Sequence, residues 1–244
     1  MEAVIEVENL SKSYGPIAAV RGVGFSVRRG EAFGLLGANG AGKSTTMECI
    51  LGTKRQDAGT VTVLGMDPHR DRKKLFERVG VQFQEAAWQE KIRVAELCEV
   101  TACLYRAPLD YRGLLGQFGL ADKWKSPIGE LSGGQRQRLS VLLALIPKPD
   151  VVFLDELTTG LDARARRDVW KSLSGLKEKG IAVLLTSHFM DEVEALCDAI
   201  LILRRGECVF QGTVRQAVEG SPCANFEDAY LWYTDEGVMN HESI

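Results

Sequence analysis

The sequence predicts an α/β fold built around a mixed central sheet. Apolar runs of strand length occur at 32–36, 151–154 and 181–186. Each run is followed by a glycine-rich or polar turn and then by a segment with helical spacing of its apolar residues. Buried parallel strands appear in sequences as continuous apolar runs, whereas half-exposed strands alternate. The repeated order of strand, turn and helix therefore predicts parallel strands whose C-terminal ends meet at one edge of the sheet.

The elements predicted along the chain fit one domain over 1–244. Residues 1 to about 84 alternate strands with a helix at 45–51, and 85–147 is mostly helical with no convincing strand. Beyond residue 150 the strand–helix pattern resumes, with helices near 164–179 and 190–196 and a pair of strands at 199–203 and 207–210. We therefore predict a core from 1–84 and 148–220, a helical insertion at 85–147 and a tail at 221–244. The segment 225–233 is either a helix packed on the core or an interaction element, and we favour packing.

A phosphate-binding loop lies between the first buried strand and the first helix. The eight residues from Gly37 to Ser44, GANGAGKS, fit the P-loop pattern, in which backbone N–H groups at a helix N-terminus surround an anion. Lys43 would contact the β- and γ-phosphates, Ser44 would hold Mg²⁺, and Thr45 could donate to the α-phosphate. The alternative is an ordinary glycine turn, which the flanking strand and helix disfavour. The predicted nucleotide contacts are Gly37, Asn39, Gly40, Ala41, Gly42, Lys43, Ser44 and Thr45.

Two carboxylates follow the buried run 151–154. Asp155 is placed to orient Mg²⁺ or its water, and Glu156 is the candidate general base for the attacking water. A hydrophobic strand that ends in Asp-Glu is common and usually leads into a solvated turn. The P-loop upstream favours the catalytic interpretation.

These motifs occur in an order that resembles the nucleotide-binding domains of ABC transporters. The shared segments are 37–45, LSGGQRQRL at 131–139, 151–156, 159–162 and 186–188, and the resemblance spans nearly the whole chain. It implies a P-loop NTPase of the ABC type, with an antiparallel β subdomain at the N-terminus and an inserted α-helical subdomain. LSGGQ is far more specific than the P-loop alone.

The resemblance also implies a composite site. Two such domains would pack head to tail, with ATP between the P-loop of one and LSGGQ of the other, either as a homodimer or with a paralogue. Ser132, Gly133, Gly134 and Gln135 form a second helix N-terminus suited to a γ-phosphate. Asp162 would belong to the loop that crosses the interface, and His188 would contact the γ-phosphate and steady the water near Glu156.

Three further positions follow from the same resemblance. Tyr14 stands where the family places an aromatic ring on adenine, although an ordinary hairpin tyrosine is a credible alternative. Gln84 stands where a glutamine reaches Mg²⁺ and the water, but Gln82 would face the same side of a strand, so both stay open. Leu157 replaces the proline that usually follows the Asp-Glu pair; we expect altered coupling at most, and unchanged ATPase rate and dimer affinity in Leu157→Pro would show the position to be neutral.

Composition limits the partners and the compartment. A net charge of −3 gives no electrostatic case for nucleic acid, and 1–8 lacks the basic start and apolar region of a signal peptide. No apolar run approaches membrane-spanning length. The six cysteines form no CxxC pair, so we expect reduced thiols and no structural metal. We expect a cytoplasmic protein, peripheral on the cytoplasmic face of the cell membrane.

The predicted function is an Mg²⁺-dependent ATPase that energises a transporter through separate membrane permease subunits. The segments 164–170 and 190–198 are most similar to drug, antibiotic or polysaccharide exporters, and no extra C-terminal domain of the sugar-importer kind is expected. One alternative is a soluble non-transport ABC ATPase, for example of the iron–sulfur assembly type. The other is a switch that uses nucleotide only to dimerise, which would not need the carboxylate of Glu156.

Overall fold

The computed structural model describes residues 2–82, 89, 91–156, 158 and 161–235. Its central sheet has six strands in the order β5-β6-β7-β3-β8-β9. The strands β5, β6, β7, β3 and β8 run parallel to their neighbours, and β9 is antiparallel to β8, so the sheet is mixed as predicted. The bounds are β3 (Ala32–Gly37), β5 (Val79–Gln82), β6 (Val151–Asp155), β7 (Ala182–Thr186), β8 (Ala199–Arg204) and β9 (Glu207–Gly212).

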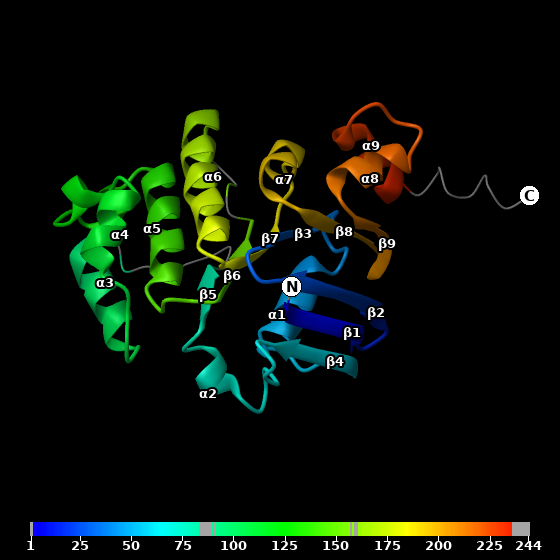
Figure 1. Ribbon diagram of the computed structural model, residues 1–244, viewed down its shortest axis with the longest axis horizontal. Helices are drawn as coiled ribbons and strands as arrows, with labels where there is room; N and C mark the ends of the chain where they lie inside the picture. The colour runs from blue at the N-terminus through cyan, green and yellow to red at the C-terminus, as the bar shows by residue number, and fades with distance from the viewer. Residues whose placement is uncertain (1, 83–88, 90, 157, 159–160, 236–244) are drawn as a thin grey trace, which may run out of the picture.

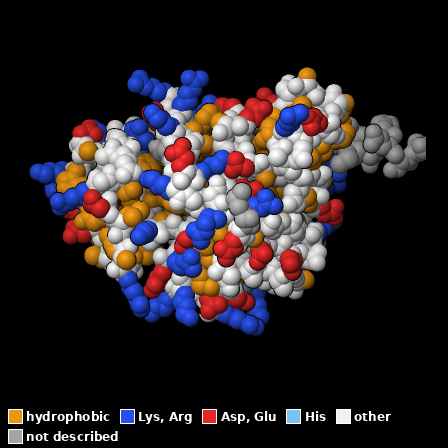
Figure 2. All heavy atoms as spheres, viewed as in Figure 1, with side chains coloured by type: hydrophobic (Ala, Val, Ile, Leu, Met, Phe, Trp, Pro, Cys, Tyr) orange, Lys and Arg blue, Asp and Glu red, His pale blue; other side chains and the backbone are white. Residues whose placement is uncertain are grey.

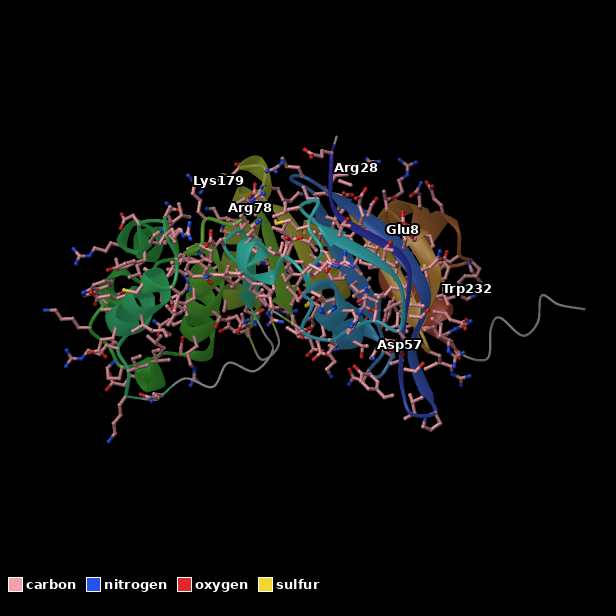
Figure 3. The ribbon with its side chains drawn as sticks, turned by 90° about the horizontal axis from the view of Figure 1, so that it is seen from below. Glu8, Arg28, Asp57, Arg78, Lys179 and Trp232 are labelled. Carbon is pink, nitrogen blue, oxygen red and sulfur yellow. The ribbon has the colours of Figure 1, made fainter. Side chains whose placement is uncertain are left out.

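The second sheet is antiparallel and has the order β2-β1-β4, with β1 (Ala3–Tyr14), β2 (Ile17–Arg28) and β4 (Ala58–Val63). Along the first part of β1 the buried side chains alternate with exposed ones, so one face packs inward. That face shares a hydrophobic cluster with helix α1 (Lys43–Ile50) and with β3. Seen from below, this sheet runs from Arg28 past Glu8 to Asp57 near the far end of the β1–β2 hairpin (Figure 3). The packing fixes α1 between the two sheets.

Helices dominate the segment between β5 and β6. Its elements are α3 (Val94–Cys103), α4 (Tyr111–Gln117), α5 (Gly133–Leu145) and the 3₁₀ turns Ala121–Lys123 and Ile128–Glu130, and a short helix α2 (Arg72–Leu75) precedes β5. Within the described part of this segment, the only β pairing outside named strands is one bridge between Arg93 and Pro127. The helices α3, α4 and α5 lie at one end of the molecule (Figure 1). They share a hydrophobic cluster with α6 (Ala163–Glu178), which connects them to the core.

The three helices after α6 extend from the middle of the molecule to the end opposite α3 and α4 (Figure 1). They are α7 (Met190–Leu196), α8 (Val214–Glu219) and α9 (Phe226–Thr234). Phe226 is fully buried and Tyr233 nearly so, in a cluster with Leu36 of β3 and Ile200 of β8. The favoured prediction that the 225–233 segment packs on the core is therefore confirmed. Across the described ranges, no helix is both long and apolar enough to cross a membrane.

Candidate nucleotide site

The P-loop connects β3 to α1 in a shape that only glycine tolerates at two positions. Gly37 has φ 147° and Gly42 has φ 106°. A Cβ on Gly37 would lie 2.5 Å from the carbonyl oxygen of Leu203, and one on Gly42 would lie 2.4 Å from that of Ala19. Both distances are shorter than a carbon–oxygen contact allows, and both glycines have positive φ, so a side chain at either position would displace the loop.

Helix α1 offers a cradle for an anion. The first turn of any helix leaves backbone N–H groups without intrahelical acceptors, and the N-cap here is Gly42, which has no side chain to accept them. Ser44 is exposed and Thr45 is half-buried in this turn, while Asn39 and Gly40 are exposed in the loop before it. Ala41 closes the loop by donating its N–H to the carbonyl oxygen of Ala38 at 3.0 Å. These groups fit a bound phosphate chain.

Lys43 is folded back into the loop. Its Nζ donates to the carbonyl oxygens of Gly37 at 2.7 Å and Ala38 at 3.2 Å, and the residue is only 6% exposed. Burial lowers the pKa of Lys43, while the carboxylates of Glu156 and Asp155 oppose that shift by favouring the charged amine. The lysine and both acidic residues therefore act on one another electrostatically, although they are more than 110 positions apart in sequence.

A threonine hydroxyl connects the two carboxylates that end β6. Thr186, fully buried at the end of β7, donates its hydroxyl to Oδ1 of Asp155 at 2.6 Å and accepts the backbone N–H of Glu156 at 3.0 Å. Glu156 has φ 49°, in the left-handed region that non-glycine residues rarely adopt. The hydroxyl thus holds the backbone turn that carries Glu156 away from the strand direction.

His188 meets Glu156 directly. Nε2 of His188 lies 2.5 Å from Oε1 of Glu156, a short hydrogen bond between side chains that are 31% and 13% exposed. His188 follows β7 in the sequence, and β7 is the neighbour of β6 in the sheet. The parallel register places the ends of both strands at one edge, so the proposed base and the imidazole come together there.

The turn between β8 and β9 also forms a hydrogen bond with the P-loop. The backbone N–H of Gly206 donates to the carbonyl oxygen of Ala41 at 3.0 Å, and the carbonyl oxygen of Gly206 accepts from the N–H of Arg21 at 2.8 Å. Gly206 has φ 83°, and a Cβ there would lie 2.7 Å from the carbonyl oxygen of Ala19. The β8–β9 turn therefore joins the loop to β2.

The LSGGQ residues lie at the N-terminus of α5, as the sequence predicts. Ser132 accepts the N–H of Gln135 with its hydroxyl at 3.2 Å and donates its own N–H to Oε1 of Gln135 at 3.0 Å. Gly133 has open space around its α-carbon, whereas a Cβ on Gly134 would lie 2.9 Å from Cβ of Ala165. In the described part of the chain, no hydrogen bond joins these residues to the P-loop. The structure thus does not bring LSGGQ to the phosphate cradle of the same chain.

The remaining predicted residues are located as follows. Asp162 caps α6 by accepting the N–H of Ala165 at 2.8 Å. Tyr14 ends β1 with 40% of its surface exposed, and Nζ of Lys54 and of Lys12 lie 5.1 and 5.6 Å from the centre of its ring. Gln82 ends β5 and is buried. Gln84 and Leu157 lie outside the described residues.

The family model described as ABC transporter matches residues 20–159, more than half of the chain. The chain belongs to the ABC transporter family. It is 40% identical over 222 residues to the Nod factor export ATP-binding protein I of Ralstonia nicotianae, which covers 88% of this chain and 68% of that protein. It is 36% identical to the linearmycin resistance ATP-binding protein LnrL of Bacillus subtilis, over 86% of this chain and 69% of the relative.

A third relative is longer than this chain. The probable multidrug ABC transporter ATP-binding protein YbhF of Escherichia coli is 36% identical over 99% of this chain, and the chain spans 43% of its length. Among solved structures, an ATP-binding subunit of an ABC transporter superposes with a TM-score of 0.85 at 27% identity, over 95% of this chain and all of that one. This protein is therefore an ATP-hydrolysing subunit of the ABC type, and the predicted fold class and enzyme class are confirmed.

Sequence reasoning missed several groups that shape the site of this ABC ATPase. Thr186 belongs to the shared segment 186–188, whose pattern does not indicate that its hydroxyl joins Asp155 to the backbone of Glu156. Gly206 falls in the turn between the strands predicted at 199–203 and 207–210, and its backbone N–H contacts the P-loop. The glycine beside a strand pair was the available signal for Gly206, but no local pattern indicates which loop it meets.

Proposed function

We propose that this cassette binds two ATP molecules in a head-to-tail dimer, formed with a second copy or with a paralogue. The convergence of Lys43, Asp155, Glu156 and His188 at one sheet edge beside the P-loop is the observation that carries the proposal. The N-terminus of α5 supports the composite arrangement, because Ser132 is exposed and Gly133 has open space around it. A second subunit could therefore place its nucleotide there without displacing any side chain of this segment.

The residues divide the chemistry between them. The P-loop amides and Lys43 bind and orient the phosphates, and Tyr14 stacks on the adenine. Ser44, Asp155 and Gln84 are the candidate Mg²⁺ ligands, and hydroxyl, carboxylate and amide oxygens suit that ion. Mg²⁺ supplies positive charge beside the phosphate oxygens when it is bound. Glu156 accepts a proton from the attacking water, and His188, hydrogen-bonded to Glu156, orients that carboxylate and contacts the γ-phosphate.

A membrane permease is the proposed mechanical partner. Helix α3 exposes Val100 at 56%, and its C-cap Leu104 is 74% exposed. A 270 Å³ pocket between α3, α5 and β5 lies beside the helix. Hydrophobic atoms are exposed between basic side chains over the helical end of the molecule (Figure 2). A short apolar cytoplasmic segment of a permease fits such a surface. The protein would then be peripheral on the cytoplasmic face of the membrane.

Export is the direction we propose. The relatives named for Nod factor export, linearmycin resistance and multidrug transport support it. The non-transport and dimerisation-switch alternatives receive no comparable support from these relatives. A carboxylate next to a histidine also suits hydrolysis better than a binding switch, which has no use for a polarised water.

The base is tested with Glu156→Gln, which keeps the size of the side chain and removes its charge. We expect turnover to fall by roughly a hundred- to ten-thousandfold. ATP should still bind, and the dimer should persist in ATP and Mg²⁺ on a sizing column. The control is Glu194→Gln on the exposed side of α7, which should hydrolyse ATP normally. Near-normal turnover of Glu156→Gln would place the base elsewhere.

The partner is tested by isolating tagged Glu156→Gln protein from detergent-extracted native cells with ATP and Mg²⁺. We expect a multi-span membrane protein to accompany it. Adding Leu104→Glu at the C-cap of α3 should abolish that recovery, whereas Leu231→Glu on α9, a leucine 56% exposed, should not. Recovery of soluble partners only, or of the cassette alone, would contradict the transporter function.

A further inference from the structure

A buried carboxylate is hydrogen-bonded to the residue that precedes the histidine of the site. Glu192, on α7, is 1% exposed, and within the described ranges it is the acidic residue that the fold buries most completely. Burial raises the pKa of Glu192, because it penalises the charged form, and hydrogen bonds from surrounding side chains act in the opposite direction. A carboxylate in such a position costs free energy unless donors satisfy both of its oxygens. The groups that donate hydrogen bonds to Glu192 indicate its role.

The first donor belongs to the residue that precedes His188. Ser187 donates its hydroxyl to Oε2 of Glu192, and the same hydroxyl accepts the backbone N–H of Phe189 at 3.0 Å. Ser187 and Phe189 flank His188 in the sequence, so one hydroxyl holds the chain on both sides of it. Glu192 in turn holds the hydroxyl of Ser187, a residue that is 1% exposed. His188 therefore lies in a turn whose backbone is held by the Ser187 hydroxyl, and that hydroxyl is held by Glu192.

The second donor comes from α6. Nε1 of Trp170 donates to Oε1 of Glu192 at 3.1 Å. Two more contacts join the same elements: Nη1 of Arg166 lies 3.3 Å from Oδ2 of Asp191, and its guanidinium lies 4.7 Å from the ring centre of Phe189. Helix α6 starts immediately after its cap Asp162. These three contacts therefore tie the segment that carries His188 to α6.

We propose that Glu192 is a positioning residue for His188: it holds the Ser187 turn and fixes that turn against α6, so that the imidazole reaches Glu156. The inference rests on the proposed role of His188 in hydrolysis. The hydrogen bond between the two side chains is 2.5 Å long, and a displacement of about 1 Å would break it. Misplacement on that scale can reduce a catalytic rate by on the order of a hundredfold.

The proposal is tested by steady-state kinetics of three single variants and one double variant. The single variants are Ser187→Ala, Glu192→Ala and His188→Ala, and the double variant is Ser187→Ala/His188→Ala. Glu194→Ala, on the exposed side of the same helix, is the control. We expect Ser187→Ala and Glu192→Ala each to lower kcat for ATP hydrolysis about ten- to hundredfold, with KM for ATP changed less than about threefold. If Glu192→Ala does not fold, Ser187→Ala carries the test, because it removes only one hydroxyl.

The double variant separates positioning from general destabilisation. If the turn acts through His188, adding Ser187→Ala to His188→Ala should lower kcat by less than about twofold. Equal losses in both backgrounds, or wild-type kcat in Ser187→Ala, would overturn the inference and leave the proposed role of His188 intact. Unchanged kcat in His188→Ala would instead overturn that role, and the inference with it.

Discussion

Thr186→Val is the substitution whose effect the structure defines most closely. Valine has nearly the volume of threonine and the same β-branching, so the fully buried position keeps its packing. What disappears is the hydroxyl, which donates to Asp155 at 2.6 Å and accepts from the N–H of Glu156 at 3.0 Å. The hydrogen bond to the carboxylate is worth about 1.5–3 kcal/mol and the one from the backbone about 1 kcal/mol. The folded state should therefore lose roughly 3 kcal/mol.

Two assays check this estimate. In a domain of this length each kcal/mol corresponds to about 2–4 °C, so thermal unfolding should show a Tm lowered by roughly 6–12 °C. At a temperature where the variant is folded, kcat for ATP hydrolysis should fall about ten- to hundredfold, because Asp155 and Glu156 lose their common support. Thr234→Val is the matched control, since that hydroxyl bonds the carbonyl oxygens of Tyr230 and Leu231, both in its own helix. A Tm within 2 °C of wild type together with kcat within about twofold would refute the reasoning.

Three other outcomes follow from the structure. Gly42→Ala should weaken ATP binding by more than about tenfold in a titration, because its Cβ would lie 2.4 Å from the carbonyl oxygen of Ala19, while Gly175→Ala, with open space, should bind normally. Tyr14→Ala should raise KM for ATP about tenfold and Tyr14→Phe should not, if the ring stacks on adenine. Asp150→Asn should lower Tm at pH 7 by about 2–5 °C, and the difference should vanish in unfolding curves recorded at progressively lower pH.

The sign of the Asp150 effect comes from its partners. Burial alone would raise the pKa of Asp150, but hydrogen bonds from Arg78 and Arg29, both at 2.8 Å, hold it below the ordinary value of 3.8. A carboxyl with a lowered pKa in the folded state stabilises that state above the unfolded pKa, and the contribution disappears as the pH falls through the folded pKa. Arg78 lies between the helical end and the sheets (Figure 3), so this ion pair supports the start of β6.

Local patterns predicted the elements closely where one physical signal acted alone. The continuous apolar runs gave β3, β6 and β7, and the glycines before Lys43 gave the P-loop, because close approach of backbone to phosphate requires residues without a side chain. The helix at 190–196 was predicted with the bounds that the structure shows. The aromatic tail was predicted to pack, and the fully buried Phe226 confirms it.

The motifs gave the order of the site residues along the chain, and the structure shows which of them are in contact. It joined Glu156 to His188 across 32 positions, and it left Ser132 and Gln135 paired with each other at an exposed helix end. It also put Glu192 behind the histidine, which no spacing indicated, because a glutamate at the start of a helix ordinarily faces solvent. Such pairings depend on which strands and helices are neighbours, and periodicity does not encode neighbours.

The sequence by itself determined the family, the phosphate loop and the acidic strand end, because each is recognised from short runs of residues whose types suit one local structure, such as glycines before a lysine or carboxylates after an apolar strand. Tertiary structure decided which distant groups complete them: Thr186 on Asp155 and Glu156, Gly206 on the P-loop, and Glu192 beneath His188. The physical reason is that buried polar groups need hydrogen-bond partners. The strand order β6-β7-β3-β8 determines which groups become partners, because it brings together strand ends that are far apart in the sequence.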